Sequence, residues 1–275
     1  MSEIGSILLH VDAAAASVTR LEIALQLAAS HDARITALYG AAPDGDKSFA
    51  YSASAALSAS DWGGPARDHA AARLLRRVAG AGAGPEVTWC DIVGDSIAHG
   101  FVAEAAYADL LVVGQQTGPA ESGAAPAGFL EAAVLDSGKP TLVVPSRPRT
   151  ATVGRCVLVA WNGSSQAARA VDGAMPILQR AQAVHVVSWA RQQVCAPYSR
   201  IDLGQALKRH GVVATIHRHD ASPRVADELC RQAVDLEADL VVMGCYGRGR
   251  LSERVFGGAT RSALSGMPVP VLMAH

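Results

Sequence analysis

The feature that most constrains the fold is an internal repeat, because the same strand-forming patterns occur twice along the chain. The apolar run that ends in Asp12 reappears 150 positions later, where it ends in Asn162. The repeat continues at an offset of 150 for residues 33–39 with 183–189, and at 130 for residues 108–114 with 238–244 and for Pro140 with Pro270. The chain is therefore a tandem duplication. The difference of 150 − 130 = 20 residues is mostly an Ala/Ser-rich insertion in the first half.

Each half alternates strand patterns with helix patterns. In the first half, short apolar runs of the kind buried in parallel sheets alternate with segments of helical spacing. The predicted strands are 6–12, 33–39, 87–90, 109–114 and 140–144, and the predicted helices include 17–30, 96–107 and 129–136. This alternation predicts an α/β fold with two doubly wound, five-stranded, Rossmann-like parallel-sheet domains. Their predicted bounds are 1–146 and 152–275, on either side of a Pro-containing linker.

Composition excludes several classes of function. The formal net charge is −1 and neither sign forms a long run, so we expect no nucleic-acid partner. No basic region precedes an apolar stretch and no run of about 18 apolar residues occurs, which favours a cytoplasmic protein without a membrane partner. Five cysteines without a C-x-x-C pair are typical of reduced thiols, not of a disulfide framework or a zinc site.

One glycine-rich segment predicts a binding site. The apolar strand 240–243 runs into Gly244-x2-Gly247-x9-Gly257, and the next residues lead into a segment of helical spacing. Glycines let backbone amides approach a ligand that a Cβ would hold away, and the unpaired amides of a helix N-terminus suit a phosphate. A bare glycine turn is also common in plain loops. Because this loop follows the penultimate strand and not the first, the pattern disfavours a dinucleotide site.

This spacing, within a duplicated βα pattern, resembles the universal stress protein family, and the resemblance covers nearly the whole chain as a tandem pair. It implies a sensor or partner module of the stress response that binds ATP or another adenine nucleotide in the second half. The family also has Ser or Thr directly after the third glycine, where this chain has Gly258, so one hydroxyl is missing. The resemblance assigns the nucleotide to Trp161, Asn162, Ser188, Met243, Gly244, Gly247, Arg248, Gly249, Gly257, Gly258, Ala259 and Thr260.

Two of these assignments have simpler alternatives. Asn162 stands where family members usually have an Asp that contacts the nucleoside, yet Asn162 or Ser164 could merely cap the helix that follows. The two interpretations are compatible. Arg248 and Arg250 either neutralise phosphates or are solvated loop arginines.

Catalytic and metal-ligating patterns are weak. The pair His217-x-His219 shares one face of a strand, but two imidazoles are few for a structural zinc site, so we expect no metal. Gly-x-Ser-x-Gly, Walker A, Ser-Gly-Gly-x-Asp-Ser and paired strand-end carboxylates are absent, so no catalytic residue is assigned and no enzyme is expected. The alternatives are an interaction or scaffold protein with vestigial sites, and slow ATP hydrolysis.

The sequence predicts that the two halves differ in binding. At the offset of 130, Gly247, Gly257 and Thr260 correspond to Thr117, Ala127 and Leu130, which removes two glycines and a hydroxyl. Nucleotide is therefore expected in the second half only.

The last strand of each half predicts how the halves pair. These strands contain Leu142 and Val271, and they would expose unpaired backbone if they stayed at a sheet edge. We therefore expect intramolecular pairing of the two domains through them. The resemblance also allows a homodimer, which no feature of the sequence fixes.

Overall fold

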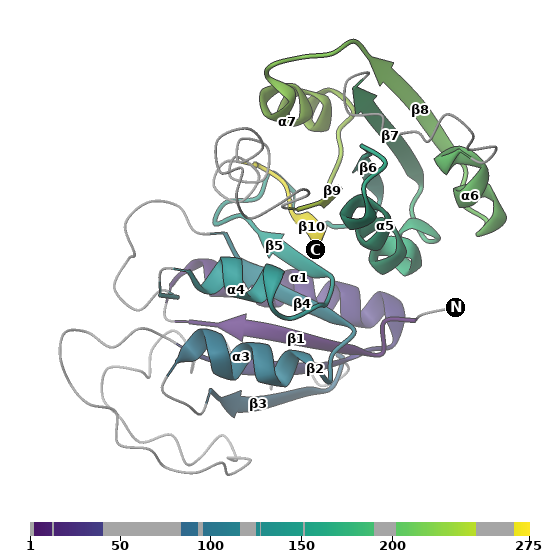
Figure 1. Cartoon of the computed structure of the whole chain (residues 1–275). Helices are drawn as coiled ribbons and strands as arrows, with labels where there is room; N and C mark the ends of the chain where they lie inside the picture. Colours follow the sequence, from purple (N-terminus) through teal and green to yellow (C-terminus); the bar gives the residue numbers. More distant parts are fainter. Residues whose placement is uncertain are drawn as a thin grey trace. The chain divides into compact units, whose positions relative to one another are not determined.

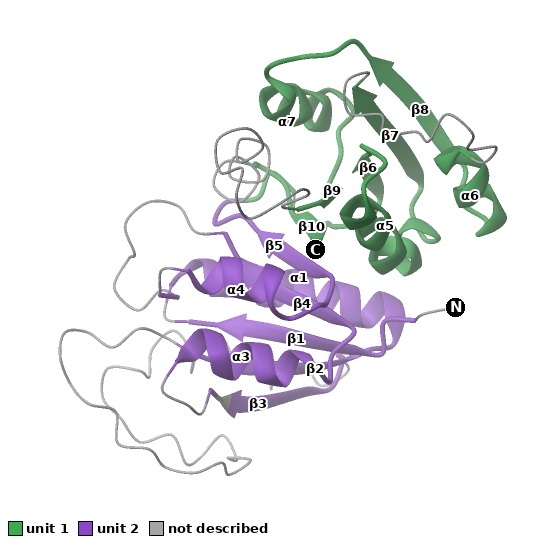
Figure 2. Ribbon diagram, in the orientation of Figure 1, with its two compact units in different colours: residues 1–2, 148–275 green, residues 3–147 purple. Residues whose placement is uncertain are grey.

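The chain divides into two compact units, shown in different colours in Figure 2. The first unit comprises residues 3–147 and the second unit residues 148–275. The computed structural model describes residues 3–12, 14–40, 84–92, 96–115, 125–126, 128–150, 152–189, 202–245 and 267–275. The predicted glycine loop beyond Cys245 and the predicted first-half counterparts Thr117 and Ala127 lie outside these ranges.

The first unit is a parallel sheet with helices on both faces (Figure 1). Its strands pair in the order β3-β2-β1-β4-β5, and every pair is parallel. In Figure 1, α1 lies on the opposite face of this sheet from α3 and α4. The described elements are β1 (Ser6–Val11), α1 (Ala16–His31), β2 (Arg34–Tyr39), β3 (Val87–Asp91), α3 (Ile97–Ala105), β4 (Leu110–Gly114), α4 (Phe129–Leu135) and β5 (Thr141–Val144).

The second unit repeats this arrangement. Its strands pair in the order β10-β9-β6-β7-β8, again all parallel, so the first strand of each unit lies between the second and the fourth. The predicted α/β class with a doubly wound parallel sheet is confirmed. The described elements are β6 (Cys156–Ala160), α5 (Ser165–Leu178), β7 (Ala183–Trp189), α6 (Leu203–Arg209), β8 (Ala214–His219), α7 (Val225–Asp235), β9 (Leu240–Gly244) and β10 (Val271–Ala274).

The central strands are buried along their length because helices cover both faces of each sheet. Leu9, Val112, Leu158 and Val242 are all fully buried. The helices keep the repeat as well, since six of the seven buried positions of α1 match buried positions of α5 at an offset of 150. The buried pairs are Ser17 with Ala167, Arg20 with Ala170, Leu21 with Val171, Ala24 with Ala174, Leu27 with Ile177 and Ala28 with Leu178. None of the described helices combines the length and apolar character that crossing a bilayer requires.

Candidate functional site

The candidate site lies where the strand order of the second unit reverses. In doubly wound sheets ligands bind outside the carboxyl ends of the strands at this point, which here falls between β6 and β9. The two strands pair up to Ala160 and Met243. Trp161 still donates its backbone N–H to the Val187 carbonyl at 2.8 Å, and the chain leaves the sheet after it. Asn162 and the β9 terminal residue Gly244 therefore lie at the same edge.

Asn162 begins a turn into helix α5. Its Oδ1 accepts a hydrogen bond from the Ser164 backbone N–H at 3.0 Å, and Ser164 Oγ accepts from the Ala167 N–H at 3.1 Å. Ser164 is thus the N-cap of this 14-residue helix, as the simpler alternative proposed. Asn162 is partly exposed, and its Nδ2 group has no hydrogen-bond partner within the described ranges. Among the described residues, therefore, none occupies the two N–H groups of Asn162.

Gly244 has a packing role that the sequence analysis did not assign. A Cβ on this residue would lie 2.4 Å from the backbone N of Ala167 and 2.6 Å from the carbonyl carbon of Gln166. The first turn of α5 therefore packs directly against the end of β9, and only glycine leaves room for it. The role predicted for Gly244 is to let a ligand approach the backbone, whereas its role in the structure is to leave room for close contact between α5 and β9.

The other predicted contacts divide into three groups. Ser188 and Met243 are buried at the ends of β7 and β9, so they form the floor of this edge and not its surface. Trp161 is half-buried beside Asn162. The remaining predicted residues lie outside the described part of the chain, and they are Gly247, Arg248, Gly249, Arg250, Gly257, Gly258, Ala259 and Thr260.

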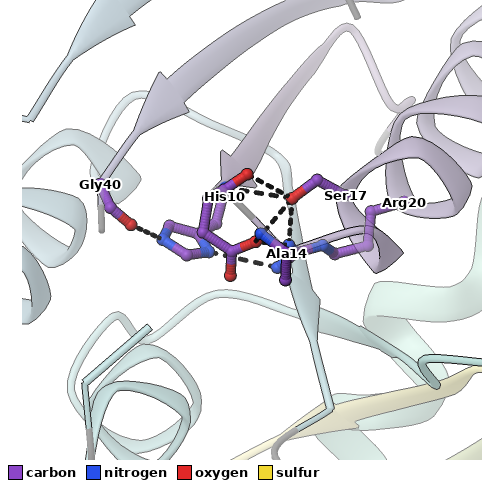
Figure 3. A network of polar contacts seen from close by, with 6 residues as sticks. His10, Ala14, Ser17, Arg20 and Gly40 are labelled. Atoms are coloured by element: carbon purple, nitrogen blue, oxygen red, sulfur yellow. Dashed lines mark hydrogen bonds and ion pairs between the residues drawn. The ribbon is translucent and has the colours of Figure 1, made fainter. Parts of the chain in front are cut away.

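The corresponding edge of the first unit holds a buried polar network (Figure 3). Its members are His10, Asp12, Ser17 and Arg20, none more than 3% exposed. Arg20 Nη2 lies 2.5 Å from Asp12 Oδ1, which also accepts from Ser17 Oγ at 2.6 Å and from the Ala14 backbone N–H at 3.1 Å. A buried carboxylate with these donors is stabilised in its charged form.

His10 completes this network in a neutral form. Its Nε2 donates to the Gly40 carbonyl at 2.8 Å, because a carbonyl can only accept, so Nδ1 accepts from Arg20 Nη1 at 3.3 Å. Burial, and next the Arg20 guanidinium, lower the pKa of His10 to about 4, although Asp12 and the Gly40 carbonyl act in the opposite direction. Burial alone would raise the pKa of Asp12, but Arg20, His10 and Ser17 outweigh it and the pKa is lowered.

This network is not among the features predicted from the sequence, although the sequence contains a signal for it. The helical spacing of residues 17–30 puts Arg20 on the same stripe as Leu21, Ala24 and Leu27, and a charge on a buried stripe requires a partner. The second unit carries no such charge. At the offset of 150, His10, Asp12, Ser17 and Arg20 correspond to Ala160, Asn162, Ala167 and Ala170.

The two histidines of the metal alternative make different contacts. His217 Nε2 lies 3.1 Å from Nδ1 of His185 on the neighbouring strand, whereas His219 stacks on Trp189 with ring centroids 5.7 Å apart. Burial, and next His217, lower the pKa of His185. Within the described ranges, no group of three or more His, Cys, Asp or Glu side chains is placed to hold a metal ion.

Comparison with known proteins assigns the second unit to a family. Residues 155–275 match the model of the Universal stress protein family, so the chain carries one domain of this family there. The first unit lies outside the matched residues, although the sequence analysis predicted a domain of this family in both halves. No curated protein matches the chain.

Solved structures extend the likeness of the fold to both units. A universal stress protein from Archaeoglobus fulgidus DSM 4304 aligns with 98% of this chain and 97% of its own, at a TM-score of 0.65 and 16% identity. A candidate universal stress protein from Pseudomonas aeruginosa UCBPP-PA14 aligns with 98% of this chain and 92% of its own, at a TM-score of 0.58 and 17% identity. A functionally unknown protein from Pseudomonas aeruginosa PAO1 aligns over the same shares of the two chains, at a TM-score of 0.57 and 18% identity. The first unit therefore shares the fold.

Proposed function

We propose that the second unit binds ATP or another adenine nucleotide at the carboxyl ends of β6 and β9, and that the protein acts in stress physiology as a sensor or partner module. The observation that carries this proposal is the meeting of Asn162 and Gly244 at the reversal of strand order, directly before the glycine motif. The family match covers the same residues and supports it.

The local chemistry suits a nucleotide. Asn162 Nδ2, which has no partner among the described residues, can donate to a neutral base or sugar, and Arg169 of α5, which donates to the His275 carbonyl at the end of β10, places a positive charge at this edge. The N-terminus of α5 adds roughly 0.3–1 kcal/mol for a nearby negative group. The absent hydroxyl at Gly258 removes a hydrogen bond to a charged phosphate worth about 1.5–3 kcal/mol, so the affinity is about tenfold or more below that of a complete motif.

Calorimetric titration with ATP and with AMP tests the site in three proteins, the wild type, Gly257→Val and Ala127→Val. We expect one site in the wild type, its loss in Gly257→Val and no change in Ala127→Val, which alters the matched position of the first half. Two sites, or loss with Ala127→Val alone, would show that the halves are assigned wrongly. A folded wild type that binds neither nucleotide would favour the scaffold alternative.

Binding without efficient turnover is the expected activity. No described residue at the edge of β6 and β9 combines a nucleophile with a general base, and Ser164 is already used as a helix cap. Phosphate release from ATP measures this directly. A turnover of about 1 per second that survives repurification and disappears in Gly247→Ala would contradict the proposal.

A further inference from the structure

We propose that the Arg20 side chain fills the carboxyl ends of β1 and β4 in the first unit, where a ligand would otherwise bind. By filling this position it excludes nucleotide from the first unit, so that only the second unit binds the ligand. The inference rests on the proposed function of the second unit. It gives a reason for nucleotide binding in the second unit only, and this reason is independent of the difference between the two glycine loops.

Arg20 spans the crevice from one layer of helices to the other. It belongs to α1, yet its guanidinium bonds to His10, whose ring packs against Phe101 of α3 and Phe129 of α4. Those two helices lie on the opposite face of the sheet from α1 (Figure 1). The side chain therefore crosses the carboxyl ends of β1 and β4, which is where a doubly wound sheet would take a ligand.

The end of β4 leaves room for this crossing. A Cβ on Gly114 would lie 2.6 Å from Arg20 Nη1 and 3.0 Å from Cζ, so the guanidinium rests against the glycine backbone. In the second unit the matched Gly244 accommodates the backbone of α5 instead. The same glycine position admits a charged side chain in one unit and a helix in the other.

The network also uses the group that a nucleoside would need. Asp12 stands at the position that the family resemblance assigns to the nucleoside, but Arg20, Ser17 and Ala14 saturate its Oδ1 and the residue is 3% exposed. A ligand that took this carboxylate would leave a buried guanidinium without its partner, which is strongly unfavourable.

The fold itself does not require these charges. The second unit builds the same strand order with Ala160, Asn162, Ala167 and Ala170 at the four matched positions. Arg20 Nε is buried without a hydrogen-bond partner among the described residues, so the network is not an optimal stabilising device. What the network does is fill the carboxyl ends of β1 and β4 with the Arg20 side chain and compensate the charge of Asp12 there.

The double variant Asp12→Asn/Arg20→Ala tests the inference, because it gives the first unit the residues that the second unit already tolerates at Asn162 and Ala170. The full-length chain is photo-crosslinked with 8-azido-ATP, and labelled peptides are assigned to each unit by mass spectrometry. We expect the wild type to be labelled in the second unit only. In the double variant, label in the first unit should exceed the background of the wild-type first unit by about tenfold or more. Arg34→Ala, which removes an exposed arginine of the first unit, should leave the pattern unchanged.

The outcomes separate this inference from the proposed function. A folded double variant labelled only in the second unit would overturn the role of Arg20. Label that appears in the first unit of the double variant, while the second unit takes none in either protein, would support Arg20 and refute the proposed function. If the double variant does not fold, Asp12→Asn/Arg20→Ser replaces it, because it also removes the buried charge and shortens the side chain; label in its first unit supports the inference, whereas none refutes it.

Discussion

The two units fold the same five-stranded sheet, but at matched positions beside the first and fourth strands one unit buries an ion pair and the other has uncharged residues. Asp12 and Arg20 are buried together in the first unit, where the second has Asn162 and Ala170. The helix positions Ser17 and Arg20 are buried, as are Ala167 and Ala170 at the matched positions, so the fold fixes the burial of these helix positions and leaves their polarity free. A buried charge is retained only where the chain also supplies its partner.

This difference has an energetic consequence. Burying an ion pair costs desolvation that the mutual attraction only partly offsets, so such a pair adds little net stability, yet breaking it leaves an uncompensated charge. The edge of the first unit should therefore be sensitive to single substitutions. The edge of the second unit has uncharged residues at the matched positions Asn162 and Ala170, so it should tolerate substitutions there better.

The largest expected effect comes from exchanging the matched residues Asp12 and Asn162. Asp12→Asn leaves Arg20 buried without its carboxylate and should destabilise the first unit by about 3–5 kcal/mol. Asn162→Asp introduces a partly exposed carboxylate that still accepts from Ser164, so its cost should stay within about 1 kcal/mol. Hydrogen exchange read by peptide mass spectrometry follows β1 and β6 separately. Equal losses in the two variants would contradict the comparison.

The next effect is a dependence on pH that belongs mainly to the first unit. The pKa of His10 is about 4 in the folded protein, against an ordinary value of 6.5 for the unfolded chain, so the unfolded state binds more protons between these pH values. Stability should fall as the pH drops from 6.5 to 4, by up to about 3 kcal/mol at 1.4 kcal/mol per pH unit. His185 gives the second unit a change of the same sign, because its pKa is also lowered, but it is less buried.

Unfolding in urea at several pH values, with pulsed hydrogen exchange to separate the units, measures this dependence. His10→Gln keeps a donor for Gly40 and an acceptor for Arg20 but does not titrate, so its first unit should lose most of the slope. A slope that is unchanged in His10→Gln would place the titrating group elsewhere.

The sequence predicted the fold well because the repeat constrains it strongly. Short apolar runs that recur at fixed offsets, as around Leu8 and Leu158, have few other interpretations than buried parallel strands. The helix of residues 17–30 was predicted to within two residues of α1 (Ala16–His31) for the same reason. These predictions depend only on local periodicity.

The candidate site was harder because it depends on tertiary contacts. The packing role of Gly244 follows from the approach of α5 to β9, and the contact between His185 and His217 follows from the order of β7 and β8. Neither can be read from spacing along the chain. Arg20 was the one missed feature with a local signal, a charge on an apolar helical stripe.

A smaller effect is expected at the two matched glycines. Gly244→Ala places a Cβ 2.4 Å from the backbone of Ala167, which cannot move alone, so overpacking should cost about 3 kcal/mol. Gly114→Ala meets the far end of the Arg20 side chain, which can shift, and should cost about 1–2 kcal/mol. The same hydrogen-exchange experiment compares the two units. A larger loss in Gly114→Ala would show that the arginine is held more rigidly than the helix.

The smallest expected effect separates helix capping from ligand contact in the second unit. Ser164 Oγ accepts from the Ala167 N–H at 3.1 Å, so Ser164→Ala should destabilise the second unit by about 1 kcal/mol. Ser96→Ala removes the matching type of cap from α3 in the first unit, where Ser96 Oγ accepts from the His99 N–H at 3.3 Å, and should cost a similar amount there.

Neither cap substitution removes a group that the proposed nucleotide site depends on, because Ser164 Oγ is already engaged by α5 and Ser96 belongs to the other unit. Ser165→Ala is the control for Ser164→Ala, since Ser165 is exposed and, among the described residues, its hydroxyl donates to the Gln166 side chain and caps no helix. ATP titration should therefore give one site in all three variants. If Ser164→Ala abolished ATP binding while the exchange of β6 stayed unchanged, Ser164 would be a ligand contact and not a cap, and the edge of the second unit would extend further along the turn than Asn162.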